Sequence, residues 1–127
     1  MTISGMAYLA ERLTSLGIPF SWMRWEGDTA TESTYYFVGE ASETTTENRQ
    51  ESGRQESTVV LRGFTRGTHL MLLEAKETIE AELPGQTKLE DGTGIAICYD
   101  DGNLVSTGNA DLKSIKIDLT VQEWKER

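Results

Sequence analysis

The stretch Ile115-Lys116-Ile117-Asp118-Leu119-Thr120-Val121-Gln122 decides the fold of this chain. Apolar residues occupy every odd position, and polar residues occupy every even one. Because successive side chains of a β-strand point to opposite sides, this alternation predicts a strand with one buried and one solvated face. Such a strand is typical of an antiparallel sheet that is covered on one face only.

The residues before this strand predict a partner for it. The apolar run Thr93–Tyr99 is expected to form a strand, and Asp100-Asp101-Gly102-Asn103 contains the residues that favour a turn between two strands. Cys98 is the only cysteine and lies in the apolar run, so an internal disulfide is excluded. We expect its thiol to pack as a small hydrophobic group.

Two amphipathic helices are predicted, over residues 3–16 and 68–83, because apolar residues recur there at spacings of three and four. Their apolar stripes are Met6, Leu9, Leu13 and Leu16 in the first helix, and Leu72, Ala75, Ile79 and Leu83 in the second. Gly17 and Pro84-Gly85 are suited to end the helices, and Thr68 is a candidate N-cap.

The middle of the chain predicts a hairpin. Residues 34–41 and 58–64 are rich in aromatic and branched side chains and are expected to be its strands. The tract between them, about 42–57, is almost wholly polar, and we expect it to be a long flexible hairpin tip because it cannot bury enough apolar surface. The aromatic segment 20–25 is expected to be extended.

These elements predict a single α+β domain over residues 1–127, with an antiparallel sheet and two helices packed on one face. The expected order is helix-strand-strand-helix-strand-strand. A length of 127 residues is enough for one core without disulfides.

The net charge of −9 argues against a nucleic-acid-binding surface, which needs Lys and Arg to neutralise phosphates. It also argues against docking on anionic membranes. The N-terminus lacks the pattern of a signal peptide, and no apolar stretch reaches the length of a membrane span. We therefore expect a protein of the reducing cytoplasm.

No residue pattern indicates catalysis, a cofactor or a metal ion. His69, the only histidine, has no nucleophile at a recognisable spacing, and one histidine with one distant cysteine does not make a zinc site. The acidic turn Asp100–Asn103 lacks the alternating carboxylates of a calcium loop. Gly92-Thr93-Gly94 precedes a strand, whereas phosphate loops precede a helix. We therefore expect a protein that is not an enzyme.

Three stretches resemble the tail-terminator (tail completion) proteins of long-tailed bacteriophages. They are Tyr35–Glu40 leading into the polar tip and returning through Val59–Leu61, the acidic helix after Phe64–Gly67, and Tyr99–Gly102 followed by Ala110–Leu112 and the last strand. The likeness in element order and size spans nearly the whole chain. The aromatic segment 20–25 departs from the family pattern.

The resemblance implies a structural protein that forms a ring, usually of six subunits, on the last ring of the tail tube. Such a ring ends tube polymerisation and offers a joining surface to the head connector. The implied partners are further copies of the chain, the tail tube protein and the head–tail connector protein, with DNA only passing through the channel. The implied location is the host cytoplasm during assembly and then the tail or neck of the virion.

We expect contacts with these partners at polar, charged and aromatic positions. The interface candidates are Glu43, Glu47, Arg49, Glu51, Arg54, Arg62, Arg66, Asp100, Asp101 and Trp124. Trp124 is included because a tryptophan near the end of the last strand is costly to leave exposed on a monomer.

Two other functions remain open at this stage. A head-completion or head–tail joining protein of the neck is also small and ring-forming. An acidic inhibitor that imitates DNA is the alternative from a different class, although here much of the acid lies in a tract that also contains Arg49 and Arg54.

Overall fold

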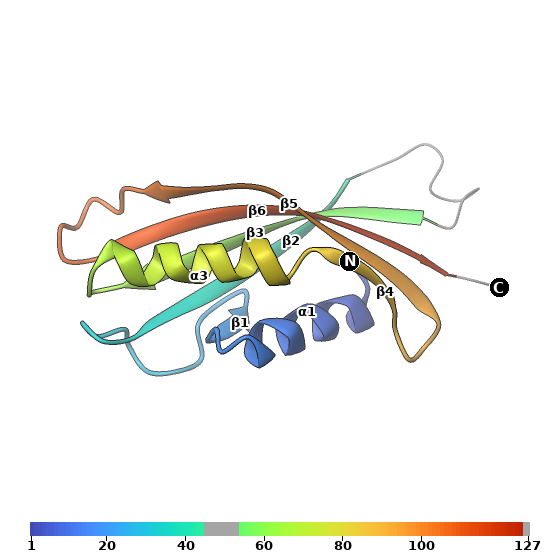
Figure 1. The fold of residues 1–127 in the computed structure, drawn as a ribbon, viewed down its shortest axis with the longest axis horizontal. Helices are drawn as coiled ribbons and strands as arrows, with labels where there is room; N and C mark the ends of the chain where they lie inside the picture. The colour runs from blue at the N-terminus through green and yellow to red at the C-terminus, as the bar shows by residue number, and fades with distance from the viewer. Residues whose placement is uncertain (45–53, 126–127) are drawn as a thin grey trace.

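A computed structural model describes residues 1–44 and 54–125 (Figure 1). The elements in chain order are α1 (Ile3–Ser15), β1 (Phe20–Trp22), β2 (Tyr35–Thr44), β3 (Arg54–Thr65), α3 (His69–Glu82), β4 (Gly85–Lys88), β5 (Thr93–Val105) and β6 (Lys113–Lys125). They form one sheet of six strands in the order β1-β2-β3-β6-β5-β4, and both helices pack on the same face of it.

The predicted fold was wrong in its element order and in its purely antiparallel sheet. Each helix precedes three strands rather than two, and β1 pairs with β2 in parallel. The aromatic segment supplies this parallel strand: Phe20 lies opposite Phe37, and the Phe37 amide donates a 2.8 Å hydrogen bond to the Pro19 carbonyl. Residues 23–34 give the long connection that a parallel pair needs.

The second missing strand is β4, which follows Pro84 directly. All of its residues are exposed, so its side chains show no alternation that could have revealed it. Backbone pairing with β5 forms it, with Gly85 opposite Ile97 and Lys88 opposite Gly94.

Strand β5 continues through the residues that were predicted to turn. A bulge at Asp100 separates the pair Tyr99–Leu119 from the pair Asp101–Asp118, and β5 then runs on to Val105. The extra residue shifts the register without ending the strand. The chain turns instead over residues 106–112, where Gly108 has a φ of 79°.

Cys98 is exposed, so the prediction that its thiol is packed was wrong. Ile97 and Tyr99 face the helices, and Cys98 therefore faces the opposite side of the sheet. We call that side, which carries residues such as Val38, Arg62 and Lys116, the outer face.

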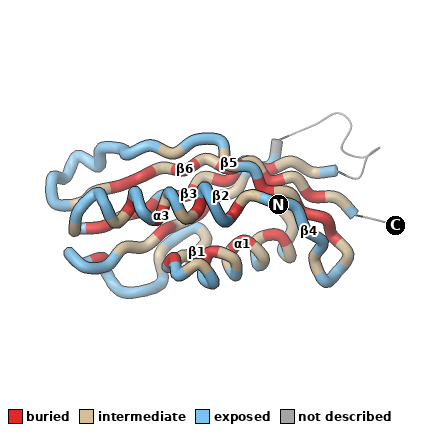
Figure 2. The backbone as a smooth tube through the Cα atoms, viewed as in Figure 1, coloured by how far each residue is buried: buried red, intermediate tan, exposed pale blue. Residues whose placement is uncertain are grey.

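The core lies between the inner face of the sheet and the two helices (Figure 2). The four alternating apolar residues of β6 are fully buried there, as predicted. They pack with the predicted helix positions Leu9, Leu13, Leu72, Ala75, Ile79 and Leu83. Helix α1 begins at the predicted residue and ends one residue before the predicted end. Thr2 caps its start through a hydrogen bond with the Gly5 amide, and Gly17, with a φ of 80°, follows its end.

The hairpin strands are longer than predicted, which shortens the tip. Ser42 pairs with Thr58 and Thr44 with Glu56, while residues 54–57 also pair with β6 on their other side. The expectation of a flexible tip was therefore wrong at both of its ends. The remainder of the predicted tip, residues 45–53, lies outside the described residues.

The facing of β6 can be tested with two neighbouring substitutions. Ile117→Ala should lower the free energy of unfolding by about 2–5 kcal/mol, because Ile117 is fully buried. Lys116→Ala, on the outer face, should change it by less than about 0.5 kcal/mol. Urea denaturation measures both, and equal losses would show that the strand is not one-sided.

A candidate interface at the hairpin end of the sheet

The inner face of the sheet turns polar toward the end that carries the β2–β3 hairpin. The alternation of β6 continues past Val121, which places Glu123 on the inner face with an exposed fraction of 1%. Gln55 of β3 lies opposite Glu123 of β6. Ser57 is buried beside them, opposite Val121. A carboxylate in this position needs hydrogen-bond donors, because burial removes it from water.

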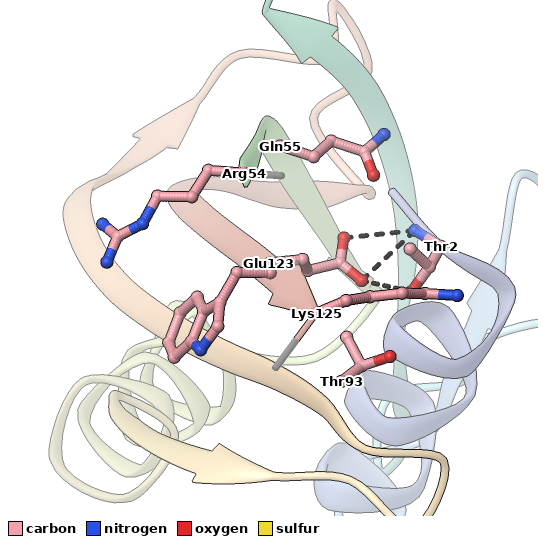
Figure 3. A pocket seen from close by; sticks show the side chains of 7 residues that line it. Thr2, Arg54, Gln55, Thr93, Glu123 and Lys125 are labelled. Atoms are coloured by element: carbon pink, nitrogen blue, oxygen red, sulfur yellow. Dashed lines mark hydrogen bonds between the residues drawn. The ribbon is translucent and has the colours of Figure 1, made fainter. Parts of the chain in front are cut away.

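The N-terminus of α1 supplies those donors (Figure 3). The Thr2 amide donates to the Glu123 carboxylate, with distances of 3.1 Å to Oε1 and 3.3 Å to Oε2, and the Thr2 hydroxyl donates to Oε2. The same hydroxyl accepts a 3.0 Å hydrogen bond from the Gly5 amide. The negative charge also faces the positive end of the helix dipole, which stabilises it.

A tryptophan and an arginine stack on the outer face at the same end. The Arg54 guanidinium lies 5.4 Å from the centre of the Trp124 ring, a cation–π arrangement. Trp124 in turn covers Gly94 of β5, where a Cβ atom would overlap the indole ring. Gly94 is therefore required for this packing, and Trp124 is half-buried within the monomer.

A hollow of about 210 Å³ lies at this end of the sheet, next to both Glu123 and Trp124. It is lined by Thr2, Arg54, Gln55, Thr93, Glu123, Trp124 and Lys125. Beside it, the amino group of Met1 lies 3.0 Å from Glu43 Oε1. Contacts at this end thus join α1, β2, β3, β5 and β6, and we call these residues together with Met1 and Glu43 the hairpin base.

The chemistry of the hairpin base suits binding. Glu123 is engaged by Thr2, and no cluster of three or more potential metal ligands occurs among the residues that the structure describes. Arg54 and Lys125 are exposed and supply positive charge around the hollow, next to the aromatic surface of Trp124. Arginine with tryptophan is a combination enriched at protein interfaces.

The structure brings together three of the predicted interface residues, Glu43, Arg54 and Trp124. It separates the others. Arg62 lies on the outer face opposite Val38 and Lys116, and Arg66 follows the far end of β3. Asp100 and Asp101 lie at the β5 bulge. Glu47, Arg49 and Glu51 fall outside the described residues.

The interface residues predicted from the sequence did not include five residues that line the hollow: Thr2, Gln55, Thr93, Glu123 and Lys125. A signal for Glu123 was present, because the odd-position alternation of β6 reaches residue 123 and predicts an inward carboxylate. Its donor was not predictable, since Thr2 and Glu123 meet only when α1 lies across the end of the sheet.

No protein-family profile matches this chain, and no curated protein matches it. Within residues 1–44 and 54–125, neither helix is long and apolar enough to cross a membrane.

The link between Thr2 and Glu123 can be tested by a double-mutant cycle. Glu123→Gln should lower the free energy of unfolding by about 1–3 kcal/mol, because it removes the charge facing the helix end. Thr2→Ala should cost about 1 kcal/mol through loss of the cap.

The double variant should lose less than the sum of the two, with a coupling of about 1 kcal/mol in urea denaturation. Glu40→Gln, at an exposed position, serves as the control and should change stability by less than about 0.5 kcal/mol. Strict additivity would contradict the proposed contact.

Proposed function

We propose that this chain is a structural protein of a long-tailed phage or prophage, which caps the tail tube as a ring and offers a joining surface to the head connector. The proposal starts from the family resemblance of the three stretches described above. In the structure, two of them include parts of β2, β3, β5 and β6, and the third is the helix α3. The resemblance is therefore spread over both halves of the sheet and does not depend on one local motif.

The observation that best supports the proposal is the arrangement of the hairpin base. The hairpin strands are fixed there by α1 and β6, and Arg54, Trp124 and Lys125 are brought together beside them. A protein that caps a polymer must present a rigid surface to the last subunit. The hairpin base is the surface that we propose for this contact.

The charge of the molecule also fits a ring around a DNA channel. The net charge is −9, and α3 has a row of exposed carboxylates on its solvent side. These are Glu74, Glu77, Glu80 and Glu82. Acidic surfaces repel the phosphates of passing DNA and keep the genome from adhering to the channel.

The shape of the sheet permits head-to-tail contacts. Its two edges differ, with β1 and β2 at one side and β4 and β5 at the other. A ring requires heterologous contacts in which one surface of a subunit meets a different surface of the next. We propose six subunits, the number that the family resemblance implies.

Purified protein mixed with tail tubes of the same phage tests the proposal. Electron micrographs should show a cap at one end of each tube, and tube protein added afterwards should no longer lengthen that end. Native mass spectrometry of the released caps should give hexamers.

Three other outcomes would contradict the proposed capping function. Binding to heads or connectors with no binding to tubes would favour a neck protein, and inhibition of a nuclease without binding to either would favour a DNA mimic. A protein that stays monomeric in the presence of tubes would contradict the ring.

The role of the hairpin tip can be tested separately. Replacing residues 45–53 by Asn-Gly leaves a four-residue connection between Thr44 and Glu56, a length that hairpins accept. The free energy of unfolding should change by less than about 1 kcal/mol, because α1 and β6 hold the strands without the tip. Tube binding in a co-sedimentation assay should fall at least tenfold. Unfolding of this variant would show that the tip is part of the core.

A further inference from the structure

Strand β5 has a long unpaired margin. Strand β4 pairs only with Gly94–Ile97, so β5 continues from Cys98 to Val105 without a neighbour on that side among the described strands. Figure 1 shows this half of β5 running along the margin of the molecule above α3. We call residues 98–105 the β5 edge. In such an edge, every second residue turns its backbone N–H and C=O groups away from the sheet, where another strand can pair with them.

Exposed leucines occur both on the β5 edge and on α3, the helix beside it. Leu104 is 43% exposed, two residues beyond Gly102 on the face toward α3. The Lys76 side chain of α3 lies next to Gly102, and the exposed Leu73 lies one helical turn before Lys76. Leu70, at 60% exposed, extends this apolar surface by a further turn of the helix. Exposed leucines beside an open strand edge favour the binding of another chain.

Unbalanced negative charge marks the first half of the β5 edge. Asp100 and Asp101 are exposed there, and no described cation forms an ion pair with either of them. The nearby cations already have acidic neighbours: Lys76 lies 4.0 Å from Glu80, and Lys116 lies 3.9 Å from Asp118. The edge is therefore complementary to a strand that carries positive charge.

The same charges disfavour a second copy of this chain as the occupant. Two β5 edges placed together would bring Asp100 and Asp101 near the same residues of the other copy. Beyond its pairing with β1, β2 carries the exposed Glu40, and its Glu43 lies 3.0 Å from the amino group of Met1. Pairing of the β5 edges of two copies would therefore place like charges opposite each other, and like charges across a strand pair destabilise it.

We propose that the β5 edge binds an extended basic segment of a partner protein, which adds to the sheet as a further strand. Lysine or arginine side chains of the segment would lie near Asp100 and Asp101, and apolar side chains would lie near Leu104 and Leu73. This inference is independent of the tail cap, since strand addition at this edge requires neither a ring nor a tube.

Two eight-residue peptides, one alternating Lys and Val and the other alternating Glu and Val, test the proposal with the full chain. Amide hydrogen exchange in residues 98–105 should slow at least tenfold with the basic peptide and remain unchanged with the acidic one. The affinity for the basic peptide should fall as salt is added, because the attraction is between exposed charges.

Matched variants separate the β5 edge from overall charge. The double variant Asp100→Asn/Asp101→Asn should have at least tenfold lower affinity for the basic peptide. The double variant Asp100→Lys/Asp101→Lys should bind the acidic peptide instead of the basic one. Glu40→Lys/Glu90→Lys makes the same change in net charge away from the edge and should alter the affinity by less than twofold.

Equal binding of the two peptides, or protection confined to other residues, would overturn the proposal. In the absence of peptide, exchange in residues 98–105 that slows as the protein concentration rises would identify a second copy as the occupant. That result would also overturn the proposal.

Discussion

The position of β6 between β3 and β5 fixes the arrangement of every other element. It is paired along nearly its whole length on both sides, so its two neighbours are set in register by one strand. Because its inner residues Ile115, Ile117, Leu119 and Val121 are fully buried, a slip of one residue would expose all of them and bury Lys116 and Asp118. The helices can then cover only the face that these side chains occupy.

The apolar face of β6 ends in a carboxylate, and this polar end determines where the N-terminus lies. A buried charge is tolerated only when donors surround it, and Glu123 obtains them from the first residues of α1. The contact joins residues that are 121 positions apart in the chain. The contact also brings the start of α1 beside Arg54 and Trp124. The same interaction therefore satisfies a buried carboxylate and positions the residues of the surface that is proposed to meet a partner.

The molecule leaves much of its sheet available for association. Among residues 1–44 and 54–125, no helix lies over the outer face, β4 pairs with only part of β5, and β1 pairs with only three residues of β2. Asp100 and Asp101 disfavour the pairing of two β5 edges, and charged residues are a common protection of sheet edges. A partner at the β5 edge, as proposed above, would be selected by its charge.

Local patterns in the sequence determined the elements whose side chains divide clearly between core and solvent. The alternation in β6 and the apolar stripes of α1 and α3 report burial directly, so these elements were predictable, and so was the one-sided sheet. Tertiary structure decided what backbone pairing alone controls: the parallel direction of β1, the existence of β4, and the continuation of β5 through the bulge at Asp100. It also decided the contact of Thr2 with Glu123. Backbone hydrogen bonds leave no trace in side-chain composition, and a contact between the two ends of a chain exists only once the sheet has placed them together.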